Sequence, residues 1–120
     1  MKKVLIADDK ATSRELVRTV LEKQGYFVIE AADGIEALTN AREAMPDAII
    51  LDLHMPGLDG FAVLQELRKD QRFAATPIMA LTASAMQGDR ERAIMSGFNA
   101  YVTKPIGLTT LRAEIDRLLR

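Results

Sequence analysis

The chain has 120 residues, of which 48% are hydrophobic and 28% charged, and its 16 basic and 17 acidic side chains give a formal net charge of −1. This length suits one domain, so we expect a single folded unit over residues 1–120. The balanced charge argues against the basic surface of a nucleic-acid-binding module. No apolar run approaches the roughly 18 residues needed to span a membrane, and there is no cysteine for a disulfide or a thiolate metal site. We therefore expect a cytoplasmic protein.

Five short apolar runs along the chain have the length of β-strands. The first, third and fourth are continuous, without polar alternation, which is typical of strands buried on both faces of a parallel sheet. The other two are shorter and predict the remaining strands. In chain order, the five runs cover residues 4–7, 27–29, 48–51, 78–81 and 100–102.

Amphipathic helical patterns separate these runs and close the chain. The first helix is introduced by Thr12, with Glu15 three residues later in capping-box spacing, and Gly25 ends it. Asp33 and Glu36 repeat the capping signal for the second helix. The apolar stripes expected to pack on the sheet are Leu16, Val17, Val20 and Leu21; Ala37, Leu38 and Ala41; Phe61, Leu64 and Leu67; and Leu108, Leu111, Ile115, Leu118 and Leu119.

The helix expected over residues 86–96 has the poorest apolar face, because polar residues interrupt it. We expect it to be the least stably packed of the five. Strict alternation of strand and helix, with right-handed crossovers, predicts an α/β fold: a five-stranded parallel sheet with helices on both faces.

Polar side chains follow four of the predicted strands at their carboxyl ends. Asp8 and Asp9 come after the first strand, Asp52 after the third, Thr82 closes the fourth, and Lys104 follows the fifth. In open α/β sheets the ligand site lies beyond these strand ends. Three carboxylates, one hydroxyl and one ammonium are therefore expected to converge at one edge.

Taken singly, these residues have ordinary structural roles as helix caps, strand-end carboxylates or a solvated lysine. Together they indicate a cation site, because crowded carboxylates repel one another and a bound cation relieves that repulsion. Mg²⁺ is the natural candidate, since it prefers oxygen ligands and is often shared with phosphate. The single histidine, His54, leaves too few ligands for a histidine- or cysteine-based metal site.

The same set suits phosphoryl transfer to a carboxylate. A carboxylate that attacks a phosphoryl group meets a like-charged electrophile, so catalysis depends on positioning and charge neutralisation. We expect the metal, Lys104 and Thr82 each to meet one phosphoryl oxygen. The product is an acyl phosphate on Asp52.

These motifs resemble the receiver domain of bacterial two-component response regulators over residues 4–119. They are Asp8-Asp9, the segment 52–60 that begins with Asp52, Thr82-Ala83 and Lys104-Pro105. Residues 82–89 are similar to those of single-domain cell-cycle-type receivers and of receivers in hybrid kinases. The resemblance implies the flavodoxin-like (βα)5 fold shared with chemotaxis regulators.

The resemblance also implies roles at the metal and phosphorylation site. Asp52 matches the phosphoacceptor, and Asp9 and Asp52 match the metal carboxylates, with Asp8 reaching the metal partly through water. The backbone carbonyl of His54 matches the last protein ligand of the metal. The His54 side chain is either an exposed loop residue or a group that tunes hydrolysis of the phosphoryl group, with Ser84 as another candidate for the latter role.

Further positions match the conformational switch of the family. Thr82 and Lys104 match its hydroxyl and lysine, and the bond before Pro105 is expected to be cis. Tyr101 matches the aromatic residue that turns inward on activation, but it could equally be a half-buried strand tyrosine with its hydroxyl in water. Phosphorylation would then reshape the surface formed by the fourth helix, fifth strand and fifth helix.

The partners implied are a sensor histidine kinase or a histidine phosphotransfer protein and a downstream protein target, with no direct binding of nucleic acid or membrane. The chain is expected to be a monomer or a phosphorylation-linked dimer. It is not expected to be an enzyme, apart from self-catalysed phosphoryl transfer and autodephosphorylation. The sequence names neither the kinase, the stimulus nor the output, and leaves open whether the chain is a whole protein or one domain of a larger one.

Three alternatives compete with this interpretation. A phosphohydrolase of the haloacid-dehalogenase type needs a second aspartate two residues after the nucleophile, where His54 stands, and a nucleophile after the first strand. A flavodoxin-like cofactor-binding module needs a Ser/Thr/Gly-rich phosphate loop, where this chain has Asp8, Asp9 and Lys10. A degenerate receiver that serves only as a binding surface is opposed by the intact acidic set.

Overall fold

A computed structural model describes residues 1–83, 88–105 and 107–119. None of the helices in these ranges has the length and hydropathy needed to cross a membrane. In chain order the elements are β1 (Lys3–Ala7), α1 (Ala11–Lys23), β2 (Phe27–Ala31), α2 (Gly34–Ala44), β3 (Ala48–Asp52), α3 (Gly60–Lys69), the 3₁₀ turn η1 (Gln71–Phe73), β4 (Ile78–Thr82), α4 (Asp89–Ser96), β5 (Ala100–Thr103) and α5 (Leu108–Leu118).

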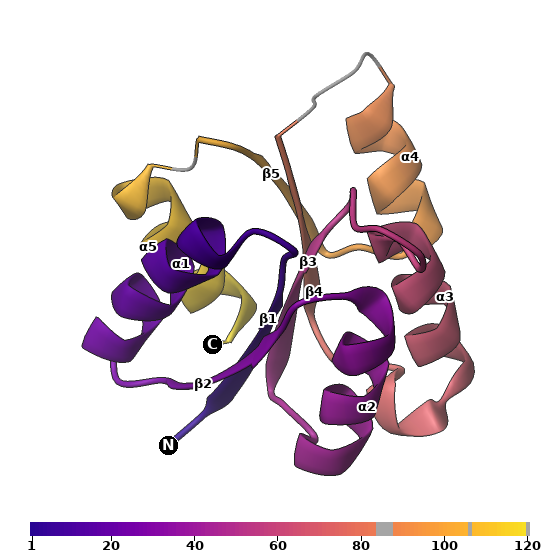
Figure 1. The fold of residues 1–120 in the computed structure, drawn as a ribbon, viewed down its shortest axis with the longest axis horizontal. Helices are drawn as coiled ribbons and strands as arrows, with labels where there is room; N and C mark the ends of the chain where they lie inside the picture. The colour runs from indigo at the N-terminus through magenta and orange to yellow at the C-terminus, as the bar shows by residue number, and fades with distance from the viewer. Residues whose placement is uncertain (84–87, 106, 120) are drawn as a thin grey trace.

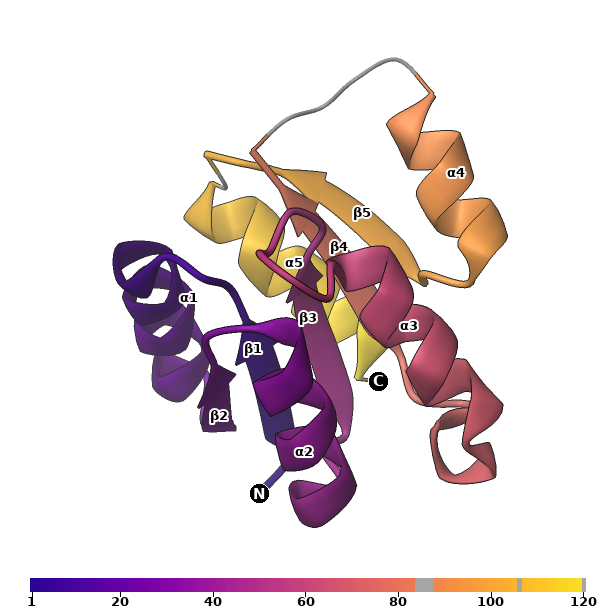
Figure 2. The same cartoon turned by 45° about the vertical axis from the view of Figure 1, so that its right-hand side comes forward.

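The five strands form one parallel sheet in the order β2-β1-β3-β4-β5 (Figures 1 and 2). This is the predicted α/β class, and each predicted strand is present. The order reverses at β1, which pairs with β2 on one side and with β3 on the other. The carboxyl ends of β1 and β3 therefore lie side by side, at the switch point where such sheets bind ligands.

Helices cover both faces of the sheet, with α1 and α5 on one face and α2, α3 and α4 on the other (Figure 2). The strand residues alternate between these faces: Val4 and Ile6 join the core under α1 and α5, whereas Leu5 and Ala7 join the opposite core. Both sets are fully buried, which explains why the sequence of β1 shows no polar alternation.

The capping signal predicted at Asp33 is confirmed, because Asp33 caps α2 by accepting the Glu36 N–H at 2.8 Å. The structure adds a cap that was not predicted, since Asp59 caps α3 by accepting the Ala62 N–H at 2.9 Å. Gly25 follows the end of α1 with φ +92°, a conformation that favours glycine.

The capping box at Thr12 was wrong. Helix α1 begins at Ala11, with Lys10 at the N-cap position and no side-chain cap hydrogen bond. The backbone N–H of Lys10 is instead bound by the Asp8 carboxylate at 2.9 Å. This bond turns the chain into the helix two residues before Thr12, which then lies within the first turn.

Two leucines of the predicted stripes are not in the core. Leu16 and Leu108 are both exposed, whereas Val17, Leu111 and the other residues closest to the sheet are buried. Apolar spacing alone does not distinguish the centre of a buried stripe from its border.

Helix α4 is the lightly packed helix that the sequence predicted. Ala93 is its only buried residue, and Ile94 and Met95 are exposed. Arg92 lies over the Phe61 ring of α3, with 4.0 Å between the guanidinium carbon and the ring centroid. Residues 86 and 87, which the prediction included in this helix, lie outside the described residues.

The first residue of α3, Gly60, lies directly against the backbone at the end of β3. A Cβ atom at this position would be 2.5 Å from the Asp52 carbonyl oxygen and 2.9 Å from the Leu53 Cα. Its N–H donates to the Leu53 carbonyl at 3.2 Å. The absence of a side chain at Gly60 therefore allows α3 to begin in contact with the strand end that carries Asp52.

We expect Gly60→Ala to lower the free energy of unfolding by about 2 kcal/mol, because the new methyl group displaces backbone rather than a flexible side chain. Gly107→Ala is the matched control, since Gly107 has φ −72° and its Cβ would meet only Thr110 Oγ1, at 3.7 Å. Urea unfolding of both variants measures the difference. Equal midpoints for the two variants would contradict the close approach described for Gly60.

Candidate functional site

Three carboxylates meet where β1 and β3 end. Asp8 and Asp9 follow β1, Asp52 ends β3, and one oxygen from each lies within 4.8 Å of the others. Asp8 is fully buried and Asp52 is 4% exposed, whereas Asp9 is exposed. The acidic cluster predicted from the sequence is therefore present, with one member open to solvent.

Lys104 brings an ammonium group into this cluster. Its Nζ lies 2.7 Å from Asp8 Oδ2 and 3.1 Å from Asp52 Oδ2, and its side chain is only 14% exposed. The backbone N–H of Lys104 donates to the Thr82 carbonyl at 2.7 Å, which continues the pairing of β4 with β5. Three carboxylates against one ammonium leave the cluster short of positive charge.

Backbone donors fix the two buried carboxylates. Asp8 Oδ1 accepts the Lys10 N–H at 2.9 Å, and Asp52 Oδ1 accepts the His54 N–H at 3.0 Å. Each carboxylate thus binds the N–H two residues further on, a turn-forming bond typical of aspartate. The same bonds leave the second oxygen of each carboxylate for Lys104.

Burial and charge push the two buried carboxyl groups in opposite directions. Burial raises the pKa of Asp52 above its ordinary value, the negative charge of Asp8 adds to the rise, and the His54 N–H and Lys104 only partly oppose it. Burial also acts to raise the pKa of Asp8, but hydrogen bonds from Lys104, the Lys10 N–H and the Ser13 side chain outweigh it and leave that pKa lowered.

Lys104 responds to both carboxylates. Burial alone would lower its pKa, but the hydrogen bond to Asp8 and the charge of Asp52 raise the pKa above its ordinary value. The ammonium therefore stays protonated, which makes it a permanent positive charge beside Asp52 Oδ2.

The remaining predicted residues surround this cluster. Thr82 is fully buried at the end of β4, next to Leu81, which is in register with Asp52. The Lys104–Pro105 peptide bond is cis, as predicted. His54 is exposed in the loop after Asp52, and Ser84 lies outside the described residues.

Tyr101 lies on β5 and packs against the core under α2, α3 and α4. Its hydroxyl is buried and has no hydrogen-bond partner among the described residues. The alternative in which this hydroxyl lies in water is therefore wrong. Burial, followed by the charge of Asp89, raises the pKa of the Tyr101 phenol.

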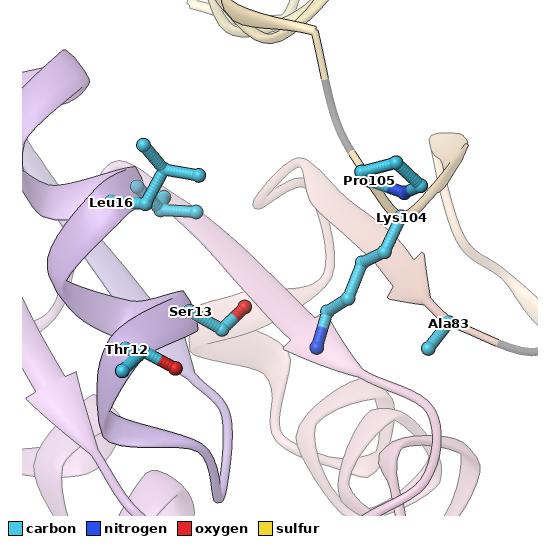
Figure 3. A pocket seen from close by; sticks show the side chains of 7 residues that line it. Thr12, Ser13, Leu16, Ala83, Lys104 and Pro105 are labelled. Carbon is cyan, nitrogen blue, oxygen red and sulfur yellow. The ribbon is translucent and has the colours of Figure 1, made fainter.

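A groove opens beside the cluster, between α1 and the segment after β5. It has a volume of about 490 Å³, and its lining includes Thr12, Ser13, Leu16, Ala83 and Lys104. Figure 3 shows the Lys104 side chain between Ser13 of α1 and Ala83 at the end of β4. The cluster can therefore be approached from this side past small and hydroxyl-bearing residues.

The donor set fits a magnesium ion. Carboxylate oxygens are hard ligands, and Mg²⁺ usually takes one or two of them and keeps several waters. The exposed Asp9 offers a side open to those waters, and the excess of negative charge favours a divalent cation. Asp8, Asp9 and Asp52 are the residues that could hold it.

Sequence reasoning missed one contact of the site. Arg14 Nη1 donates to the backbone carbonyl of Asp8 at 2.7 Å. The two residues are six apart across a loop and a helix start, a spacing with no motif, so no local signal could have indicated this bond.

Comparison with known proteins identifies the family. Residues 4–116 match the family described as the response regulator receiver domain. The chain belongs to this family. It is therefore a receiver domain of two-component systems, and the phosphohydrolase and cofactor-binding alternatives are wrong.

Individual relatives agree with the assignment. The chain is 46% identical over 118 residues to a probable transcriptional regulator, ycf27, of Guillardia theta, covering 98% of this chain but 45% of that protein. It is 39% identical over 107 residues to the polar-differentiation response regulator DivK of Brucella ovis, covering 89% and 87% of the two chains. The receiver thus spans about half the length of the first relative and most of the second.

A solved structure has the same fold. The receiver domain of the sensor histidine kinase PA1611 from Pseudomonas aeruginosa PAO1 matches with a TM-score of 0.90 and 35% identity over 98% of this receiver and 97% of that chain. That structure has a magnesium ion coordinated in its active-site cleft. Similar receivers therefore occur in transcriptional regulators, in short response regulators and in sensor kinases.

We expect Asp9→Asn to raise the free energy of unfolding of the metal-free receiver by about 0.5 to 1 kcal/mol after solvent screening, because it removes one of three crowded negative charges. We expect Mg²⁺ to raise the melting temperature of the wild type and to leave that of Asp9→Asn unchanged. Asp47→Asn is the control, since it removes an equal charge far from the site, where Asp47 accepts the Lys3 N–H. Thermal unfolding of both variants with and without Mg²⁺ measures these differences. If Mg²⁺ still raises the melting temperature of Asp9→Asn, Asp9 is not a metal ligand.

Proposed function

We propose that Asp52 accepts a phosphoryl group from the phosphohistidine of a sensor histidine kinase or a histidine phosphotransfer protein, with Mg²⁺ held by Asp8, Asp9 and Asp52. The observation that carries this proposal is the position of Lys104 Nζ, 3.1 Å from Asp52 Oδ2 inside the carboxylate cluster. A buried carboxylate with a fixed cation beside one oxygen is suited to receive a negatively charged electrophile.

The transfer exchanges one bond to phosphorus for another. An Asp52 carboxylate oxygen bonds to phosphorus, the bond from phosphorus to the imidazole nitrogen breaks, and the imidazole leaves with the electron pair. Bound Mg²⁺ supplies positive charge that offsets the repulsion between the carboxylates and the incoming group. Lys104 keeps its charge because its pKa is raised, so it neutralises a second phosphoryl oxygen.

The His54 N–H positions the nucleophile. It holds Asp52 Oδ1 at 3.0 Å and so sets the rotation of the carboxylate. The His54 backbone carbonyl lies in the same loop and is proposed as the remaining protein ligand of the metal. Thr82 is proposed to bind a third phosphoryl oxygen through its hydroxyl. It is buried and directly follows Leu81, the residue of β4 in register with Asp52.

The output surface is proposed to comprise α4, β5 and α5. In the described part of α4 only Ala93 is buried, and lightly packed segments are those that open and shift most readily. Reversal of a 1:99 population needs about 5.5 kcal/mol of differential interaction. New charge-assisted hydrogen bonds from Thr82 and Lys104 to the phosphoryl group are of the strength such a shift needs, and Tyr101 is the side chain proposed to follow.

The phosphodonor is proposed to approach through the groove beside Lys104. The groove is lined by small, hydroxyl-bearing and apolar residues of α1 and by the segment after β5, and Leu16 is exposed at its border. An apolar residue exposed there suits contact with a partner helix. The downstream target, the oligomeric state and the cytoplasmic location remain predictions.

Incubation with acetyl phosphate and Mg²⁺, followed by intact mass measurement, should show one phosphoryl group per chain. We expect none without metal and none in Asp52→Ala, because that variant lacks the proposed nucleophile. Asp8 also binds Lys104 and a backbone N–H, but it is fully buried and is not expected to replace Asp52. Asp59→Asn is the matched control, since Asp59 lies in the same loop and only caps α3. Label that persists in Asp52→Ala would refute the assignment.

The His54 side chain gives a separate prediction. The contact of His54 with Asp52 is made by its backbone N–H, and His54→Ala retains this group. We therefore expect His54→Ala to be phosphorylated at the wild-type rate. The lifetime of the phosphoryl group is measured as the loss of label after the donor is removed. A changed lifetime would assign the imidazole a role in hydrolysis. An unchanged lifetime would leave His54 an exposed loop side chain.

A further inference from the structure

Arg14 connects the acidic loop after β1 to the edge strand β2. Its Nη1 donates to the Asp8 main-chain carbonyl at 2.7 Å, and its Nε lies 3.3 Å from Glu30 Oε1. The side chain is 18% exposed. Arg14 contacts neither a carboxylate oxygen of the metal cluster nor the phosphoacceptor, so its contribution to the site has to act through the backbone.

The carbonyl that Arg14 binds belongs to the peptide group joining Asp8 to Asp9. This group is planar, so a hydrogen bond to its oxygen restricts the direction in which the chain leaves Asp8. The Asp8 N–H is held as well, by the Ala31 carbonyl at 3.1 Å. Asp9, by contrast, is exposed, and its position depends on this peptide plane more than on its own packing.

Glu30 orients Arg14 and offsets its charge. One Glu30 oxygen accepts from Arg14, and the other accepts from Arg18 Nη1 at 2.8 Å. The Glu30 carbonyl also accepts from Asn40 Nδ2 of α2 at 3.0 Å, so this part of β2 is bound from both faces of the sheet. A guanidinium paired in this way can hold the Asp8 carbonyl without cancelling the negative charge that attracts a cation.

We propose that Arg14, oriented by Glu30, is a positioning residue that holds the Asp8–Asp9 peptide so that the Asp9 carboxylate lies within reach of Asp8 and Asp52 before the metal binds. The inference rests on the proposed function, because it assigns Mg²⁺ to these three carboxylates. A charge-assisted hydrogen bond to the backbone is strong enough for this role, and groups that orient metal ligands commonly affect metal affinity.

Arg14→Met tests the role, with Arg18→Met as the matched control. Arg18 shares Glu30 with Arg14 and lies 3.4 Å from Glu22, but it does not reach Asp8. Titration calorimetry with Mg²⁺ alone should show about tenfold weaker binding for Arg14→Met and a change below about twofold for Arg18→Met. Arg14→Lys keeps a charged donor of similar reach and should recover part of the affinity.

Two further measurements separate positioning from a general loss of structure. Both variants should remain folded without metal, and Arg14→Met should melt below Arg18→Met, because it loses the bond to the Asp8 carbonyl as well as its pairing with Glu30. In phosphorylation by acetyl phosphate, Arg14→Met should need more Mg²⁺ for half-maximal rate yet reach the wild-type rate at saturation, since a bound ion itself holds Asp9 in position.

Wild-type Mg²⁺ affinity in Arg14→Met would overturn the inference, as would an equal loss in Arg18→Met or a lower rate at saturating Mg²⁺. If Arg14→Met does not fold, the Mg²⁺ titration is made with Arg14→Lys instead. Wild-type Mg²⁺ affinity in Arg14→Lys, combined with an unfolded Arg14→Met, would make Arg14 a structural residue only. Failure of the proposed function is distinct, because in that case the wild type itself neither binds Mg²⁺ nor takes up a phosphoryl group.

Discussion

The repulsion among buried carboxylates is the constraint on which this receiver depends. Asp8 and Asp52 lie at the ends of adjacent strands and share the single ammonium of Lys104. Burial raises the pKa of Asp52, with a smaller contribution from the charge of Asp8, whereas hydrogen bonds from Lys104, the Lys10 N–H and Ser13 outweigh burial and lower the pKa of Asp8. The three carboxylates of the cluster carry more negative charge than Lys104 offsets, and this excess favours the binding of a divalent cation.

The scaffold holds this unfavourable arrangement with backbone contacts. Each buried carboxylate binds the N–H two residues further along, and Gly60 lets α3 start directly against the strand end. On the other side, Arg14 ties the Asp8 carbonyl to β2. Because these contacts are made by main-chain atoms or to them, the positions of the carboxylates follow from the course of the chain as much as from their own rotamers.

The packing around the site is uneven. The loop after β1 is bound to the edge strand β2 through Arg14 and Ala31, and the loop after β3 contacts the start of α3 at Gly60. Helix α4, in contrast, buries only Ala93 and keeps Ile94 and Met95 exposed. Tyr101 of β5 packs against the core on the α4 side of the sheet, and its hydroxyl is buried without a hydrogen-bond partner among the described residues. The carboxylate cluster, bound by backbone contacts, therefore stands beside a helix that buries little of its surface.

The sequence alone determined the strands, the cap at Asp33, and the set of strand-end residues: Asp8, Asp9, Asp52, Thr82 and Lys104. These depend on local apolar patterns and on the rule that parallel strands bring their carboxyl ends together. Tertiary structure decided what local patterns do not contain. Packing left Leu16 exposed although its spacing matches the buried stripe. The earlier start of α1 is instead a local effect that the capping-box pattern missed, because the Asp8 carboxylate binds the Lys10 N–H two residues further on. The bond from Arg14 to Asp8 also needed the folded chain, because it depends on how a loop and a helix meet in space.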